Sequence, residues 1–176
     1  MDETRDSAVA SSGPVFGVAT EADVESIAAL RTDAAEHLTR AFGQGHWSRV
    51  VTDRGVRSNR KSSCLLVARR GPEIVATLRL ATKKPWAIDV AYFTAVPRAV
   101  YLHDMAVAPG LQRQGIGRRI VREAITVARA WPSQSIRLDA YDSPAGAGAF
   151  YARCDFREVG RVTYRKVPLV YFELLL

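Results

Sequence analysis

Apolar positions in the C-terminal half of the chain follow two spacings. From Ile116 they recur every three or four residues until Pro132 enforces a stop, which predicts an amphipathic helix. Mostly apolar segments at 101–107 and 136–141 flank this helix and indicate strands. A further helix is expected within 147–156.

The N-terminal half shows the same kinds of pattern. Residues 15–19 indicate a strand, and Thr20, followed by acidic residues, indicates a helix start whose apolar spacing continues to Ala34. The other expected elements are a helix over 47–57 interrupted near Gly55, strands at 65–70 and 74–80 joined by a turn, and an aromatic and proline-rich insertion at 83–98. This order predicts an α/β fold of the α+β kind, with a mixed sheet flanked by helices.

Length and composition fit one folded unit. A chain of 176 residues with 48% hydrophobic content can bury one sizeable core and is too short for two ordinary domains. We therefore expect a single domain over residues 14–176. Residues 1–13, rich in Ser, Ala and charged residues, are expected to form a disordered leader.

The net charge and the number of cysteines limit the classes of binding partner and the cellular compartment that we expect. The net charge of +7 suits an anionic partner, but no nucleic-acid motif accompanies it, so we expect no nucleic acid. Two cysteines do not make a disulfide framework in a chain of this length. No apolar stretch approaches the roughly 18 residues that span a bilayer, and the N-terminus lacks a signal peptide's apolar core. We expect a cytoplasmic protein without membrane contact.

A glycine-spaced turn opens the helix after the strand at 101–107. The free N–H groups and the dipole at a helix N-terminus bind anions, and Gly115 and Gly117 allow a close backbone approach. A Walker loop would need Gly-Lys followed by Ser or Thr, which is missing here, and a dinucleotide fingerprint would need a glycine where Ile120 stands.

The motif Gln112-x-x-Gly115-x-Gly117, preceded by Val107-x-Pro109, instead resembles the pyrophosphate loop of the GCN5-related N-acetyltransferase (GNAT) superfamily. The run at 147–156 resembles that superfamily's Ala-x-x-Phe-Tyr-x-x-x-Gly-Phe signature, with Asp155 in place of the glycine. Upstream of it, Pro144 stands where many members carry a cofactor-binding Asn. The resemblance covers most of the chain and implies a mostly antiparallel sheet whose fourth and fifth strands diverge around acetyl-CoA.

The resemblance also implies a set of cofactor-binding residues. The strand backbone would bind the pantetheine arm, and the Met105 N–H would polarise the thioester carbonyl. The loop would bind the phosphates. The complete set is Met105, Ala106, Val107, Gln112, Arg113, Gln114, Gly115, Ile116, Gly117 and Arg118.

Two residues are candidates for proton transfer. Tyr151 matches the superfamily's tyrosine that protonates the leaving thiolate, and we expect Phe150 to face the core. His103 shares a strand face with Met105 by simple alternation, so it is the first candidate for the base. Asp104, if a bulge rotates it, Tyr101, or water are the alternatives, and a core role for His103 stays open.

The acceptor side is less well defined. Aromatic side chains and one carboxylate in the covering segments would suit a cation, namely Trp47, Trp86, Asp89 and Tyr92. His37 and His46 have no partner at metal-ligand spacing, so no metal is implied. The predicted function is transfer of acetyl from acetyl-CoA to a primary amine of a small molecule. A non-catalytic CoA-binding module, a protein acetyltransferase acting on N-termini or lysines, and a homodimer remain alternatives.

Overall fold

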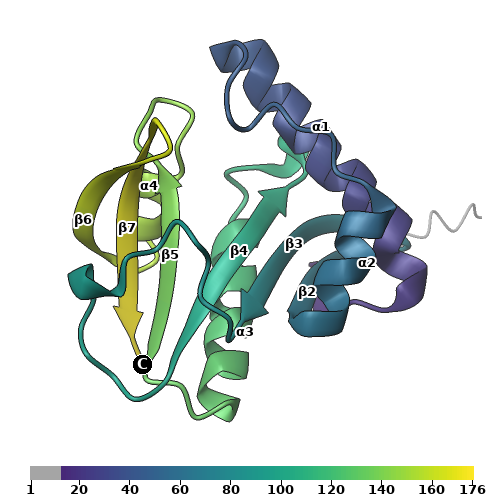
Figure 1. The fold of residues 1–176 in the computed structure, drawn as a ribbon. Helices are drawn as coiled ribbons and strands as arrows, with labels where there is room; N and C mark the ends of the chain where they lie inside the picture. Colours follow the sequence, from purple (N-terminus) through teal and green to yellow (C-terminus); the bar gives the residue numbers. More distant parts are fainter. Residues whose placement is uncertain (1–12) are drawn as a thin grey trace, which may run out of the picture.

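The computed structural model describes residues 13–176, which form one seven-stranded sheet with the order β1-β2-β3-β4-β5-β7-β6 (Figure 1). Every neighbouring pair is antiparallel except β4 and β5. The predicted mixed sheet is therefore confirmed. The strands are β1 (Val15–Val18), β2 (Cys64–Arg70), β3 (Glu73–Ala81), β4 (Ala99–Val107), β5 (Ser135–Tyr141), β6 (Arg157–Tyr164) and β7 (Val167–Leu175). The predicted leader, residues 1–13, lies outside the described residues except for Gly13.

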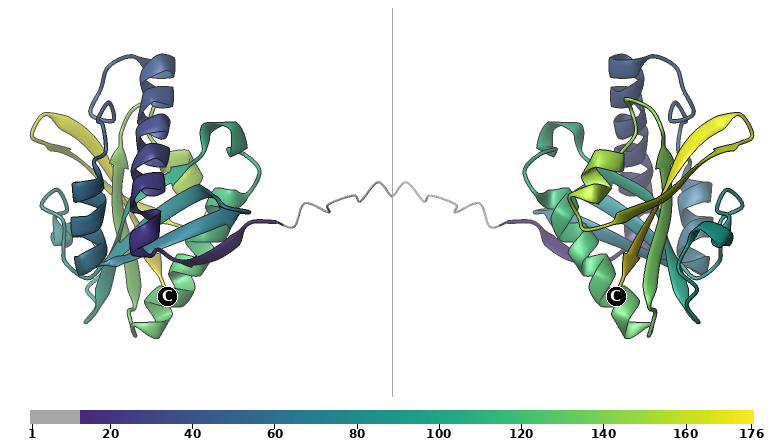
Figure 2. Two further views of the ribbon diagram at one scale, coloured as in Figure 1. Left: turned by 90° about the vertical axis from the view of Figure 1, so that its right-hand side faces the viewer. Right: turned by 90° about the vertical axis from the view of Figure 1, so that its left-hand side faces the viewer.

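Helices cover both faces of the sheet (Figure 2). One face carries α1 (Val24–Phe42) and α2 (Asp53–Ser62), and the other carries α3 (Ile116–Ala130) and the short α4 (Gly148–Ala152). Short 3-10 turns lie at Glu21–Asp23, Val90–Tyr92 and Pro109–Leu111. Among the described residues, no helix is both long and apolar enough to cross a membrane.

The second helix begins later than the sequence pattern predicts. The Thr52 side chain accepts a hydrogen bond from the Gly55 N–H at 3.2 Å, so Gly55 lies in the first turn of α2 and does not interrupt it. The helix then continues to Ser62. Residues 43–52, which we call the strap, are irregular and connect α1 to α2.

The larger core lies between the sheet and α3. The predicted 3.6-residue spacing is confirmed, because one face of α3 is buried against β2, β3 and β5. A smaller core joins α1 and α2 to the other face of β2. The buried α3 residues are Ile116, Ile120, Val121, Ala124 and Ala128.

Strands β4 and β5 pair only at one end. Their register ends at Tyr101 opposite Arg137, and beyond this pair the strands diverge (Figure 1). On its other side β4 stays paired with β3 as far as Val107. The edge of β4 that faces β5 therefore has no strand partner among the described residues after Tyr101, and a gap opens inside the sheet.

The insertion at 83–98 packs over the β5 and β7 side of the sheet. Ile88 and Phe93 are buried against Tyr101 and Tyr171. The Tyr171 hydroxyl donates to the carbonyl of residue 87. These contacts fix the insertion on the same sheet face as α1 and α2, beside the paired end of β4 and β5.

Candidate active site

A β-bulge at Asp104 sets the geometry of the gap. Thr77 of β3 lies opposite Ala106, and Arg79 lies opposite His103, so β4 has one extra residue between these pairs. Asp104 is the bulged residue, and its φ of +54° lies in the left-handed region that Asp tolerates better than most residues.

The bulge reverses the alternation of side chains along β4. Asp104 bonds to residues of α1 and α2, whereas Met105 packs into the core on the α3 side. Simple alternation predicts that His103 and Met105 share a face, and this prediction is wrong because the extra residue shifts the pleat by one position. Both residues still line the gap, from opposite faces of the sheet.

Asp104 is fully occupied by basic partners. Its carboxylate accepts from Arg31 at 2.6 Å and from Arg79 at 2.7 Å, with Asn59 at 3.4 Å. All three side chains come from different elements, so the carboxylate joins α1, α2 and β3 to the bulge. The predicted rotation of Asp104 occurs, but both of its carboxylate oxygens accept hydrogen bonds from neighbouring side chains, so neither is directed freely at a substrate.

His103 lies in a partly buried position with cationic surroundings. Burial, with a smaller effect from Arg79, lowers its pKa from 6.5 to about 4, and Asp104 only partly opposes this. The imidazole is therefore neutral at neutral pH, and its basicity is lower than the unperturbed value that sequence reasoning assumed.

Tyr151 is buried where α4 meets β4. Its hydroxyl donates to the Met105 sulfur at 3.8 Å. Burial, followed by the charge of Asp139, raises the pKa of Tyr151 above its ordinary value, so the phenol stays protonated. We expected Phe150 to face the core. Instead Tyr151 is the more buried of the two rings, and Phe150 is half-buried and lines the groove described below.

The loop before α3 presents free backbone donors. Arg113 and Gly115 have φ of +61° and +81°, which turns the chain into the helix. Within residues 13–176, the N–H groups from Arg113 to Arg118 donate no hydrogen bond to the protein. These donors lie at the positive end of the α3 dipole, where an anion would satisfy them.

Two connected cavities extend from this loop through the gap. A groove of about 720 Å³ lies along the loop, and a cavity of about 860 Å³ lies between the diverging strands. Met105, Ala106 and Tyr151 line both, so the two adjoin at these residues. The predicted cofactor residues that line the groove are Met105, Ala106, Val107, Gln112, Arg113, Gly115, Gly117 and Arg118.

Two predicted cofactor residues point elsewhere. The Ile116 side chain is buried in the core under α3. The Gln114 side chain donates to the Gly110 carbonyl at 3.4 Å. These two residues can therefore contribute to the anion site only through their backbone N–H groups, which donate to no described residue.

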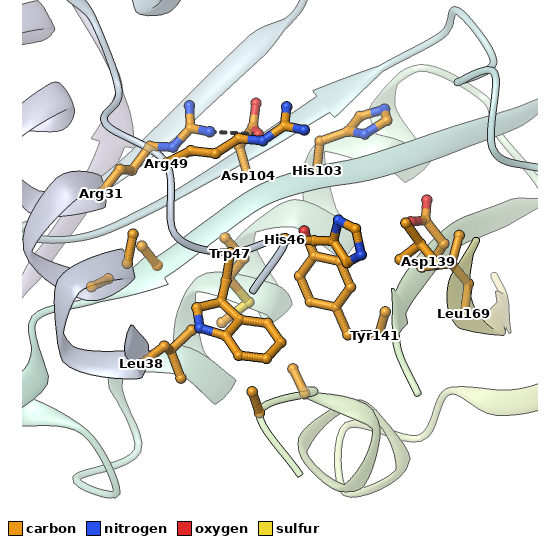
Figure 3. A pocket seen from close by; sticks show the side chains of 18 of the residues that line it. Arg31, Leu38, His46, Trp47, Arg49, His103, Asp104, Asp139, Tyr141 and Leu169 are labelled. Atoms are coloured by element: carbon orange, nitrogen blue, oxygen red, sulfur yellow. Dashed lines mark hydrogen bonds and ion pairs between the residues drawn. The ribbon is translucent and has the colours of Figure 1, made fainter. Parts of the chain in front are cut away.

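Of the predicted acceptor residues, Trp47 lines the cavity. The strap places Trp47 edge-on to Tyr141 of β5 at 5.8 Å between ring centroids, and His46 stacks on the same ring at 6.3 Å (Figure 3). The strap thus bridges α1 and β5 across the gap.

The structure places Trp86, Asp89 and Tyr92 outside this cavity. Trp86 is 86% exposed, and Tyr92 packs against Tyr171 on β7. The reason is that the insertion packs beside the paired ends of β4 and β5, whereas the cavity lies at their open ends.

Sequence reasoning missed Asp139 on β5. Its side chain lines the cavity facing Tyr141 and accepts no hydrogen bond from another described residue (Figure 3). Burial raises its pKa above the usual carboxyl value. The available signal was a single carboxylate on a strand whose neighbours, Leu138 and Ala140, are apolar and buried.

The comparisons with known proteins agree with this geometry. The sequence model of the Acetyltransferase (GNAT) family matches residues 27–156. The chain belongs to this family. No curated protein matches the chain significantly.

Several solved structures share this fold at low sequence identity. Ribosomal-protein-alanine N-acetyltransferase from Brucella melitensis is 22% identical with a TM-score of 0.71, over 92% of this GNAT chain and 99% of that chain. The yncA protein from Salmonella typhimurium, described with its cofactor acetyl-CoA, is 17% identical with a TM-score of 0.68, over 94% and 95%. An N-acetyltransferase from Staphylococcus aureus Mu50 is 16% identical with a TM-score of 0.69, over 93% and 99%.

Proposed function

We propose that this GNAT-family protein transfers the acetyl group of acetyl-CoA directly to a primary amine of a small molecule. The observation that carries the proposal is the pair of adjoining cavities that runs from the free N–H groups of Arg113 to Arg118 past Tyr151 to Asp139. It joins an anion site to a gap with proton donors and acceptors. A GNAT relative described with acetyl-CoA supports the choice of cosubstrate.

The residues of the groove fit a pyrophosphate with an extended thiol arm. The loop N–H groups and the α3 dipole suit the phosphates, and the nearby Arg113 and Arg118 add screened attraction. The unpaired edge of β4 offers backbone groups from Met105 to Val107 to an amide-containing arm. Acetyl-CoA, when bound, supplies the activated acetyl thioester.

Tyr151 is suited to protonate the sulfur that leaves. Its raised pKa keeps the proton on the oxygen until negative charge develops nearby.

We assign the base role to Asp139 in preference to His103. Protonation of Asp139 relieves the burial of a negative charge, whereas protonation of His103 would add a positive charge beside Arg79. The carboxylate can hold a substrate ammonium as an ion pair and then accept its proton as the nitrogen attacks.

The acceptor is proposed to be a small molecule because the strap covers the cavity. His46 and Trp47 contact Tyr141 and bridge the gap, which leaves about 860 Å³ for the acceptor side and the acetyl group. The Brucella relative is named for acetylation of a protein alanine, and a peptide acceptor is the alternative outcome of the test below.

Calorimetric titration with acetyl-CoA, followed by thiol-release assays with amines and with N-terminal peptides, tests the proposal. We expect stoichiometric binding and thiol release with small amines. Binding without release for any acceptor would indicate a CoA-binding module. Release with peptides alone would overturn the small-molecule assignment, and no binding would overturn the proposal as a whole.

A further inference from the structure

The side chains around the acceptor cavity include more arginines than carboxylates. Asp104 forms ion pairs with both Arg31 and Arg79, so this group keeps one net positive charge and offers no free carboxylate to a substrate cation. After these pairs are set aside, the cavity lining holds one carboxylate, Asp139, and two arginines, Arg49 and Arg165.

Neither of these two arginines has an acidic partner. Arg49 lies on the strap, and Arg165 lies in the turn between β6 and β7. Among the described residues, neither forms an ion pair, and Arg165 only stacks over the Tyr164 ring at 5.4 Å. Both guanidinium groups are therefore free to bind an oxyanion.

The turn that carries Arg165 has an unusual backbone. Arg165 and Lys166 have φ of +48° and +68°, a conformation that two-residue hairpins usually assign to Asn and Gly. A side chain at such a position carries a conformational cost that glycine would avoid. This turn places the Arg165 side chain in the lining of the cavity, where its charge is available to a ligand.

The acid and Arg49 lie on opposite walls. Figure 3 shows Arg49 beside His103 and Asp104 on the β4 side, while Asp139 and Tyr141 lie on the β5 side. A molecule with a positive amine and a negative group would match both walls at once. An amine that carries only a positive charge would be repelled by the arginines.

We propose that the acceptor carries an oxyanion, a carboxylate or a phosphate, a short distance from the reacting amine, as an amino acid does. Its ammonium binds Asp139 and its oxyanion binds Arg49, with Arg165 at the rim. This proposal rests on the proposed N-acetyltransferase function and specifies the substrate class for it.

Matched acceptor pairs test the proposal in the full-length enzyme with acetyl-CoA. Phenylalanine with phenethylamine and tyrosine with tyramine differ only in the carboxylate, and phosphoethanolamine with ethanolamine differs only in the phosphate. We expect kcat/KM to favour the anionic member of at least one pair by about tenfold or more. The favoured pair shows which oxyanion is used.

A variant that lacks the Arg49 charge then tests whether this residue binds the oxyanion. Arg49→Gln is expected to reduce that preference toward one, mainly through a higher KM for the anionic member. Arg54→Gln removes the same charge from an exposed position on α2 and should keep the preference.

The outcomes separate this proposal from the proposed function. Thiol release with equal or better use of the amines that lack the oxyanion would overturn the substrate class and leave the acetyltransferase function standing. A preference that survives Arg49→Gln would overturn the assigned recognition. Acetyl-CoA binding with no transfer to any of these amines would overturn both the substrate class and the small-amine function.

Discussion

The Tyr151 hydroxyl donates to the Met105 sulfur at 3.8 Å, across the junction of α4 with the bulged strand β4. The contact joins the proposed proton donor to the residue whose N–H is expected to polarise the thioester. The bulge at Asp104 is what makes it possible, since it turns Met105 toward the α3 side where Tyr151 is buried.

Tyr151→Phe is expected to lower turnover while keeping the cofactor affinity. The substitution removes one oxygen and keeps the ring packed against Phe156 and Phe172. We expect kcat to fall by about a hundredfold, as for loss of a general acid, with little change in the calorimetric affinity for acetyl-CoA. Near-full turnover with chemistry shown to be rate-limiting would exclude the acid role.

Gly117→Val is expected to weaken acetyl-CoA binding by at least about tenfold. A Cβ at Gly117 would lie 3.1 Å from the Met105 methyl carbon and 3.2 Å from the Phe150 ring, so a branched side chain must displace groups that line the groove. Calorimetry measures the affinity, and circular dichroism checks the fold. Gly17→Val is the control, because no atom lies within 4 Å of its added Cβ.

Unchanged affinity in a folded Gly117→Val protein would contradict the assignment of the loop. Greatly reduced stability in that variant, with the control unaffected, would show instead that the glycine is needed for packing. The two results are distinguished by comparing unfolding midpoints with binding constants.

Local sequence signals predicted those parts of the fold that depend on local structure. The α3 periodicity and the turn between β2 and β3 follow from spacing and turn residues within a few positions. The start of α2 was missed because Gly55 suggested a break, although Thr52 provides a cap three residues earlier. Capping chemistry outweighed the helix propensity of glycine there.

The parts that escaped prediction depend on contacts between distant strands. The bulge at Asp104 exists because β3 and β4 pair out of step by one residue, and no pattern within β4 alone shows this. The exposed aromatics of the insertion gave no information on which end of the sheet they cover. Asp139 was overlooked since its role depends on a gap that forms between β4 and β5 only in the folded sheet.

His103 is expected to destabilise the protein in mild acid. Its folded-state pKa of about 4 lies below the ordinary 6.5, so the unfolded chain binds more protons between these values. Stability is therefore full above pH 6.5 and is lost as pH falls toward 4, by up to about 3 kcal/mol in the free energy of unfolding. Urea unfolding at several pH values measures this change.

The comparison with His103→Gln isolates the contribution of this residue. The variant should lose less stability than the wild type between pH 6.5 and 4, while His37→Gln, outside the site on α1, should follow the wild type. Identical pH dependence in all three proteins would show that His103 is not buried in its neutral form.

Asp139→Asn is expected to lower kcat/KM by about a hundredfold or more at neutral pH, because the amide keeps the shape but cannot take a proton. Burial raises the pKa of Asp139, so the wild-type pH–rate profile should show an inflection where acid protonates this carboxylate, and that inflection should be absent in the variant, whose rate follows the neutral fraction of the substrate amine. The deficit should shrink at alkaline pH, where the substrate amine is already neutral. Asp142→Asn is the matched control, since Asp142 pairs with Arg161 at 2.9 Å outside the cavity. If kcat/KM of Asp139→Asn is reduced by the same factor at every pH, Asp139 contributes to substrate binding alone. If Asp139→Asn is fully active and His103→Gln is inactive, His103 is the base.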